Sequence, residues 1–222
     1  MGPKIISIEG NIGAGKTTLF NKLEDANTDP SILFVSEPVN QWLSFRNPSS
    51  NETILSAYYK EQEKYAFPFQ TMALMTRLSQ LNRIIDSNPD VKLIITERSL
   101  QSDYEVFAQM LYKAQKMNTI LYSIYQQIYK DFAKLPLNGV IFVNTDSLTC
   151  FERCGIRNRD GERVSLQYLR TCETQHYDWL NTLDIPFLQI PSGFELQQQF
   201  AMYGFMQKVM IANSRADISV NQ

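Results

Sequence analysis

The chain has 222 residues, of which 44% are hydrophobic and 20% are charged, which suits one large domain with a substantial core. Its net charge of −2 argues against the broad basic surface that binds a nucleic-acid polymer. No apolar run approaches the about 18 residues of a membrane helix, and three cysteines are too few for a disulfide framework. We therefore expect a single domain over residues 1–222 that works in the cytoplasm, without a leader segment, a membrane partner or a nucleic-acid partner.

The first predicted strand, residues 4–8, leads into the sequence GNIGAGKT at residues 10–17. This sequence fits the phosphate-loop pattern GxxxxGK[ST], and a helix-like stretch follows it. Glycines let successive backbone N–H groups point at one centre, in front of the positive end of that helix. We expect Lys16 to reach the β- and γ-phosphates of ATP and Thr17 to bind the Mg²⁺ ion between them. The predicted ATP-binding residues of the loop are Gly10, Asn11, Ile12, Gly13, Ala14, Gly15, Lys16, Thr17 and Thr18.

Apolar runs and helix-like segments alternate along the rest of the chain. The other predicted strands are residues 32–36, 91–96, 139–144 and 187–190. The predicted helices are residues 53–86, 100–113, 119–133, 148–157, 166–182 and 195–214, before a polar tail at about 214–222. Pro68 predicts a kink or a break in the first of these helices. Because near-continuous Ile, Val, Leu and Phe is typical of strands covered on both faces, the pattern predicts an α/β three-layer fold: a five-stranded parallel sheet flanked by helices.

Charged side chains follow the second and third predicted strands, where ligands of such sheets bind. Glu37 follows the second strand, and Glu97 and Arg98 follow the third. Phosphoryl transfer needs positioning, a metal ion and, for a hydroxyl acceptor, a base. We predict that Glu37 is that base, that Glu97 lies on the magnesium side, and that Arg98 holds Glu37 or the acceptor oxygen. A phosphate acceptor would be repelled by Glu37, so a neutral hydroxyl is the better match.

Arginine is dense in and just after the predicted helix at residues 148–157. Arg153, Arg157, Arg159 and Arg163 fall within eleven residues, and the last two lie in a polar segment with Gly161. Arginines that close over a triphosphate neutralise the charge that spreads over the transferring group. We therefore predict an arginine-rich lid at about residues 153–164, in which Arg153, Arg157 and Arg159 bind ATP.

One set of residues has the types that zinc prefers. Cys150 and Cys154, and Cys172 and His176, form two pairs at i, i+4 spacing. Half-buried cysteines on a helix usually fill space as small apolar residues. We interpret these residues as packing rather than as a zinc site.

Five motifs lie in order between residues 5 and 180. They are GNIGAGKTT at 10–18, EPVNQW at 37–42, YYKEQEKYAFPFQ at 58–70, ERSLQSD at 97–103 and IRNRDGE at 156–162. On these motifs the chain resembles the deoxyribonucleoside kinase family, which contains deoxycytidine, deoxyguanosine and broad-specificity insect deoxynucleoside kinases. The resemblance implies transfer of phosphate from ATP to the 5′-hydroxyl of a deoxynucleoside, in nucleotide salvage, with Glu37 as the base. It also implies a homodimer, for which the helix at 100–116 is a candidate face.

The resemblance also implies residues that bind the nucleoside. Gln70 would form paired hydrogen bonds with the base edge, and Trp42, Phe69 and Phe107 would line or stack on the base. Tyr59 and Glu162 would hold the 3′-hydroxyl, and Arg157 and Arg159 would bind phosphate from the lid.

Helical spacing extends the predicted base pocket. Gln70, Ala73 and Arg77 lie at i, i+3 and i+7 on one stripe, and Asp103 is the natural counter-charge of a buried Arg77. Such a pair offers polar contacts to an amino group or a purine edge and crowds the space of a thymine methyl group. We expect deoxycytidine, deoxyadenosine or deoxyguanosine to be preferred to thymidine. A surface ion pair unrelated to the base is the alternative.

Two other functions share the phosphate loop. A nucleoside monophosphate kinase of the thymidylate kinase type would need arginines, rather than Glu37, at its acceptor. The other is a non-catalytic phosphate-loop protein, either a nucleotide switch or a motor subunit. A guanine-nucleotide switch should carry an NKxD sequence after a late strand, but Asn144 is followed by Thr145 and Asp146.

Overall fold

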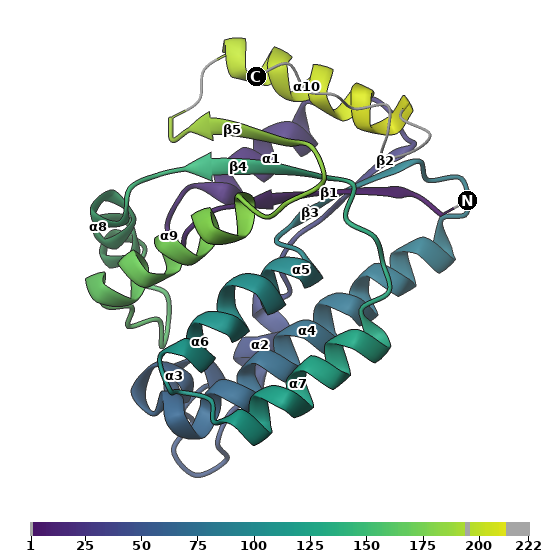
Figure 1. Ribbon diagram of the computed structural model, residues 1–222. Helices are drawn as coiled ribbons and strands as arrows, with labels where there is room; N and C mark the ends of the chain where they lie inside the picture. The colour runs from purple at the N-terminus through teal and green to yellow at the C-terminus, as the bar shows by residue number, and fades with distance from the viewer. Residues whose placement is uncertain (1, 194–195, 212–222) are drawn as a thin grey trace.

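The structure, a computed structural model, describes residues 2–193 and 196–211. Its centre is one parallel sheet whose strands run in the order β2-β3-β1-β4-β5 (Figure 1). The strands are β1 Lys4–Glu9, β2 Ile32–Val35, β3 Leu93–Glu97, β4 Gly139–Asn144 and β5 Phe187–Pro191. The predicted five-stranded parallel sheet is therefore confirmed, and each predicted strand lies within two residues of its observed bounds.

Helices cover both faces of this sheet (Figure 1). In chain order they are α1 Lys16–Asp25, α2 Val39–Ser44, α3 Ile54–Lys60, α4 Gln62–Ser87, α5 Leu100–Ser102, η1 Asp103–Ala108, α6 Gln109–Lys113, α7 Thr119–Phe132, α8 Ser147–Arg157, α9 Leu166–Leu180 and α10 Leu196–Ile211. Helices α1 and α10 contact the sheet on one face, and α4 and α7 lie side by side on the other (Figure 1). This arrangement confirms the three-layer fold.

Alternation along the strands divides the core into two clusters. Ile5 of β1 and Ile94 of β3 pack with α4 and α7, whereas their neighbours Ile6 and Ile95 pack with α1 and α10. Successive strand side chains point to opposite faces, so a strand covered on both sides is apolar at most positions. Strand β5 lies at the sheet edge, and Phe187 there is 41% exposed.

One predicted helix is wrong in its continuity, and a second has the predicted bounds but a different geometry at its centre. The segment predicted at 53–86 divides at Glu61, which separates α3 from α4, and Pro68 lies inside α4 without ending it. The segment predicted at 100–113 contains a six-residue π-helical stretch, η1, between α5 and α6. The short helix α2 was not predicted, because six residues carry too little periodicity. Parts of the predicted last helix and the tail at 214–222 lie outside the described residues.

Within the described ranges, no helix combines the length and the apolar character needed to cross a bilayer.

Candidate active site

The phosphate loop lies between β1 and α1 in a conformation that only glycine adopts readily. Gly10 and Gly13 have φ values of 142° and 81°. A Cβ atom on Gly10 would lie 2.6 Å from the carbonyl oxygen of Val143, and one on Gly13 would lie 2.5 Å from that of Cys150. The loop therefore packs its own backbone against β4 and α8 while its N–H groups stay available for an anion.

Lys16 is buried at the start of α1 and points across the mouth of the loop. Its Nζ donates to the carbonyl oxygen of Asn11 at 2.9 Å. Burial, helped by the charge of Arg98, lowers the pKa of Lys16 to about 8, and nearby carboxylates oppose the shift. A bound phosphate would add negative charge beside the ammonium group and keep it protonated.

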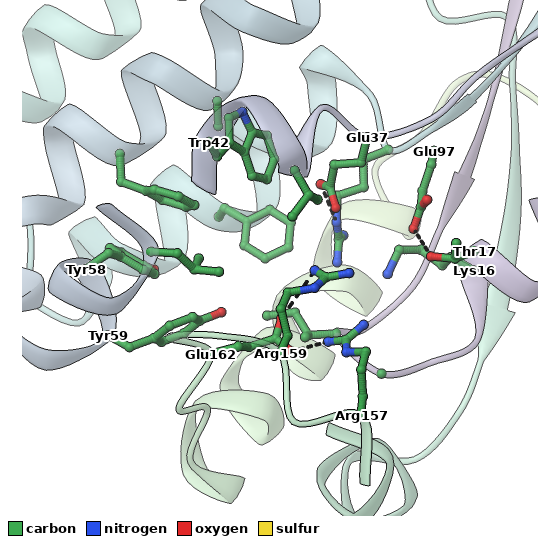
Figure 2. Close-up of a pocket in the computed structure, with 18 of the residues that line it drawn as sticks. Lys16, Thr17, Glu37, Trp42, Tyr58, Tyr59, Glu97, Arg157, Arg159 and Glu162 are labelled. Atoms are coloured by element: carbon green, nitrogen blue, oxygen red, sulfur yellow. Dashed lines mark hydrogen bonds and ion pairs between the residues drawn. The ribbon is translucent and has the colours of Figure 1, made fainter. Parts of the chain in front are cut away.

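Thr17 and Glu97 meet beside this lysine (Figure 2). The Thr17 hydroxyl donates to Oε1 of Glu97 at 2.8 Å, although the two residues are 80 positions apart in sequence. Strand pairing brings them together, because β3 runs beside β1 and Glu97 is its last residue. Hydroxyl and carboxylate oxygens are ligands that suit a hard divalent cation such as Mg²⁺. The predicted metal residues therefore fit such an ion.

Glu37 follows β2 and lies in a cluster of charged side chains. Its Oε1 atom lies 3.0 Å from Nη2 of Arg77 and 3.5 Å from Nε of Arg98. Burial would raise the pKa of Glu37, but the two guanidinium groups outweigh it and hold the pKa below its ordinary value. Glu37 is thus ionised at neutral pH, with its carboxylate on the cavity wall.

Arg77 joins the predicted base pocket to this carboxylate. The side chain is 1% exposed, and its Nε lies 2.9 Å from Oδ2 of Asp103. Its Nη1 donates to the carbonyl oxygen of Glu97 at 2.8 Å, and its Nη2 contacts Glu37. The predicted Arg77–Asp103 pair is therefore present and buried, and the interpretation as a surface pair is wrong. The contact between Arg77 and Glu37 was not predicted.

Aromatic side chains form the other end of the cavity, opposite the phosphate loop (Figure 2). The rings of Tyr58 and Phe69 stack with centroids 4.5 Å apart, and Trp42 meets Phe69 edge-on at 5.7 Å. Trp42 is anchored by a 2.9 Å hydrogen bond from its indole N–H to Thr76 of α4. Flat apolar walls of this kind suit a planar ring.

The cavity encloses about 360 Å³ and gathers most of the predicted residues. Its lining includes Ile12, Gly13, Gly15, Lys16, Thr17, Thr18, Glu37, Trp42, Tyr59, Phe69, Gln70, Ala73, Glu97, Arg98, Asp103, Phe107, Arg153, Arg157, Arg159 and Glu162. Sequence reasoning missed four other lining residues, Val39, Leu55, Tyr58 and Tyr168. Tyr58 lies in a quoted motif beside Tyr59, but Tyr168 reaches the cavity from α9 and has no local signal.

The predicted lid, residues 153–164, begins in the last two turns of α8 and borders the same cavity. Arg157 forms an ion pair with Glu162, and Arg159 lies 3.6 Å from it. Arg153 donates to the carbonyl oxygen of Ala14 in the phosphate loop at 3.2 Å. Arg163, in contrast, is exposed and lines a separate hollow beside α6. Three of the four arginines therefore converge on the place where a triphosphate would lie.

The cysteines are all buried and free of disulfide bonds. Cys172 Sγ lies 3.5 Å from Nδ1 of His176, while Cys154 packs against Gly13 of the phosphate loop. Burial raises the pKa of Cys150 to about 12, so this thiol stays protonated. The geometry agrees with packing against the loop.

A phosphate loop faced by arginines, an ionised acid and an aromatic cavity of nucleoside size defines a nucleotide-dependent kinase of the P-loop fold. Sequence comparison then gives the family. Residues 6–209 match the sequence model of the deoxynucleoside kinases, and the chain belongs to this family.

Relatives of known name agree with this assignment. The chain is 31% identical over 209 residues to the mitochondrial deoxyguanosine kinase of Xenopus laevis, which covers 84% of this chain and 77% of that protein. It is 32% identical over 197 residues to human deoxycytidine kinase, with 80% and 75% covered. It is also 32% identical over 196 residues to a probable deoxycytidine kinase of Fowlpox virus, with 84% and 78% covered. The protein is thus an enzyme that phosphorylates deoxynucleosides with ATP, as the sequence motifs predicted.

Proposed function

We propose that this kinase prefers deoxycytidine or a purine deoxynucleoside to thymidine and that Glu37 accepts the proton of the 5′-hydroxyl. The buried pair of Arg77 and Asp103 carries the proposed base preference. Asp103 lines the cavity together with Gln70 and Ala73. Its carboxylate can accept a hydrogen bond from an exocyclic amino group, which thymine lacks.

The proposed catalytic role of Glu37 follows from its two oxygens. Both arginine contacts are made to Oε1, so Oε2 is the oxygen available to a substrate hydroxyl. A base that is ionised at neutral pH can accept the proton as the 5′-oxygen bonds to phosphorus. Arg98 would steady the reacting oxygens, and Lys16 would hold the β- and γ-phosphates of ATP.

Mg²⁺ is the proposed metal, with Thr17 and Glu97 as the residues that would hold it with ATP. Bound there, the ion neutralises charge on the phosphates. Tyr59 and Glu162 would hold the 3′-hydroxyl, while Arg153, Arg157 and Arg159 would contact the triphosphate from the lid. Glu162 now neutralises the lid arginines, so arriving phosphates would compete with it for them.

The test of base preference is a steady-state comparison of the four deoxynucleosides with ATP and Mg²⁺. We expect kcat/KM for thymidine to be at least about tenfold below the best of the other three, the scale of one well-placed polar contact. If thymidine is the best substrate, the argument from Arg77 and Asp103 is wrong.

The test of catalysis is Glu37→Gln, which keeps the shape and removes the base. We expect kcat to fall by at least about a hundredfold with a small change in ATP binding. Glu24→Gln, on the exposed face of α1, is the matched control. An active Glu37→Gln enzyme would leave Glu37 with a binding role only.

We also propose a homodimer, but through a different helix from the one at 100–116. Met110 and Leu111 of that segment are buried within the protomer. Helix α7 instead exposes Ile120 at 73%, Ile124 at 45% and Phe132 at 56%, which lie four and eight residues apart on one face. Light scattering of the wild type and of Ile124→Lys would give the masses that decide this.

We place the enzyme in the cytoplasm as a single domain, which cell fractionation and limited proteolysis would test.

A further inference from the structure

Glu9 is a buried acid next to the phosphate loop for which the proposed mechanism gives no role. It is the last residue of β1 and immediately precedes Gly10. Its side chain is 0% exposed. A carboxylate is rarely buried so completely unless it is paired, so this position calls for a reason other than packing.

The carboxylate of Glu9 touches residues at the end of the neighbouring strand. Its Oε1 accepts a 2.7 Å hydrogen bond from the Ser99 hydroxyl, and its Oε2 lies 4.0 Å from Nη1 of Arg98. Among the described residues, neither Oε2 nor that Nη1 has a hydrogen-bond partner. Each therefore offers the other a partner, and the charge of Arg98 opposes the rise that burial causes in the pKa of Glu9.

Arg98 needs such support because its backbone is unusual. Its φ is 63°, in the left-handed region that a residue with a Cβ atom seldom adopts, and its N–H donates to Ile8 of β1 at 3.1 Å. This turn directs the side chain over the ring of Phe107, with the guanidinium carbon 4.5 Å from the ring centroid. Strained backbone of this kind persists where the surroundings hold it.

Two acids thus share one cation. Arg98 lies between Glu37, which borders the cavity, and Glu9, which lies behind it. If Glu9 were neutral, the guanidinium would be drawn entirely toward Glu37 and away from the phosphates. Both contacts of Arg98 are long, at 3.5 and 4.0 Å, as expected of a group balanced between two carboxylates.

We propose that Glu9 is a positioning residue for phosphoryl transfer, whose carboxylate holds Arg98 away from Glu37 so that the guanidinium can meet the transferring phosphate. The proposal rests on the proposed roles of Glu37 and Arg98. Glu9 is buried and does not line the cavity, so in this proposal it acts through Arg98. Its removal should therefore lower kcat and leave the binding of both substrates nearly unchanged.

The test is a double-mutant cycle in kcat with Glu9→Gln and Arg98→Gln. Glutamine keeps the shape of Glu9 and the hydrogen bond from Ser99 but removes the charge. In the wild-type background we expect kcat to fall about tenfold, with KM values for ATP and deoxycytidine within about threefold. In the Arg98→Gln background, the same change should alter kcat less than about twofold, because its target is absent. Glu9→Asp, which keeps the charge, should retain most of the activity.

Two outcomes would overturn the proposal: an unchanged kcat in Glu9→Gln, or an equal fall in both backgrounds. If Glu9→Gln does not give a cooperative thermal transition, Glu9→Asp is measured in the same two backgrounds, and its smaller loss must also vanish without Arg98. A failure of Glu37 as the base would be seen separately, as activity in Glu37→Gln. That result leaves the coupling between Glu9 and Arg98 measurable.

Discussion

Removing Arg77 should destabilise the protein strongly, because this side chain neutralises more than one buried group. Arg77→Met replaces the apolar stem of the side chain and deletes the guanidinium. It leaves Asp103, which is 4% exposed, and the carbonyl oxygen of Glu97 without their donors. Glu37 is less affected, since it is 15% exposed and keeps Arg98 at 3.5 Å.

The size of the effect follows from this accounting. Breaking a buried ion pair by removing one partner costs about 3–5 kcal/mol. For a chain of this length, 1 kcal/mol lowers the melting temperature by about 2–4 °C, so Arg77→Met should melt about 10 °C below the wild type. Arg77→Met combined with Asp103→Ala removes both charges and should recover part of the loss.

Asp103 gives this prediction a pH dependence. Burial raises the pKa of Asp103, and Arg77 opposes the shift. Without Arg77 the folded protein binds a proton at Asp103 more tightly than the unfolded chain does, so the contribution of Asp103 to the stability of the variant is fully present at low pH and is lost as pH rises through its raised pKa. The difference in unfolding free energy from the wild type should therefore be smaller at pH 5.5 than at pH 8.

Urea unfolding at both pH values measures this difference. Arg83→Met, on the exposed face of the same helix, is the control and should change the free energy by less than about 0.5 kcal/mol. A loss below about 1 kcal/mol for Arg77→Met, or a loss that does not change with pH, would refute the reasoning. Either result would mean that water replaces the guanidinium at little cost.

Three further predictions concern the loop and the lid. Thr17→Ala should raise the Mg²⁺ concentration for half-maximal rate by about tenfold, and Thr17→Ser should not, as a metal titration of activity would measure. The pKa of Lys16 is about 8, so its ammonium group is charged only below that pH. The value of kcat/KM for ATP should therefore decline as pH rises above 8. Gly161 has a φ of 76° and a Cβ atom there would lie 2.8 Å from Ser56, so Gly161→Ala should raise the deoxynucleoside KM severalfold, while Gly155→Ala, with open space, should not.

The parts of the site predicted from sequence are those that depend on adjacent residues and on sheet geometry. The phosphate loop is contiguous, so Gly10, Lys16 and Thr17 were identified by spacing alone. Glu37 and Glu97 were identified because parallel strands place their carboxyl ends at one edge. The hydrogen bond between Thr17 and Glu97 shows this rule acting over 80 residues.

Helix boundaries were harder to predict. Pro68 was expected to kink or break the helix. It does not break it, because packing of the apolar side chains of α4 against the sheet and α7 outweighs one missing hydrogen bond. The actual break at Glu61 has no glycine or proline to mark it. The π-helical stretch η1 likewise depends on tertiary contacts, and it carries Asp103 and Phe107 into the cavity.

The sequence predicted which charged side chains belong to the site but not all of the contacts between them. The sequence predicted one pair of Arg77 with Asp103 in the pocket of the nucleobase and a separate pair of Arg98 with the proposed catalytic carboxylate, Glu37. In the structure Arg77 contacts both Asp103 and Glu37, so the partner of the acid proposed to contact the nucleobase also holds the proposed catalytic carboxylate. A nucleobase that fits the pocket poorly and displaces Arg77 would therefore disturb the Glu37 carboxylate as well. Substrate choice is then coupled to kcat and not to binding alone.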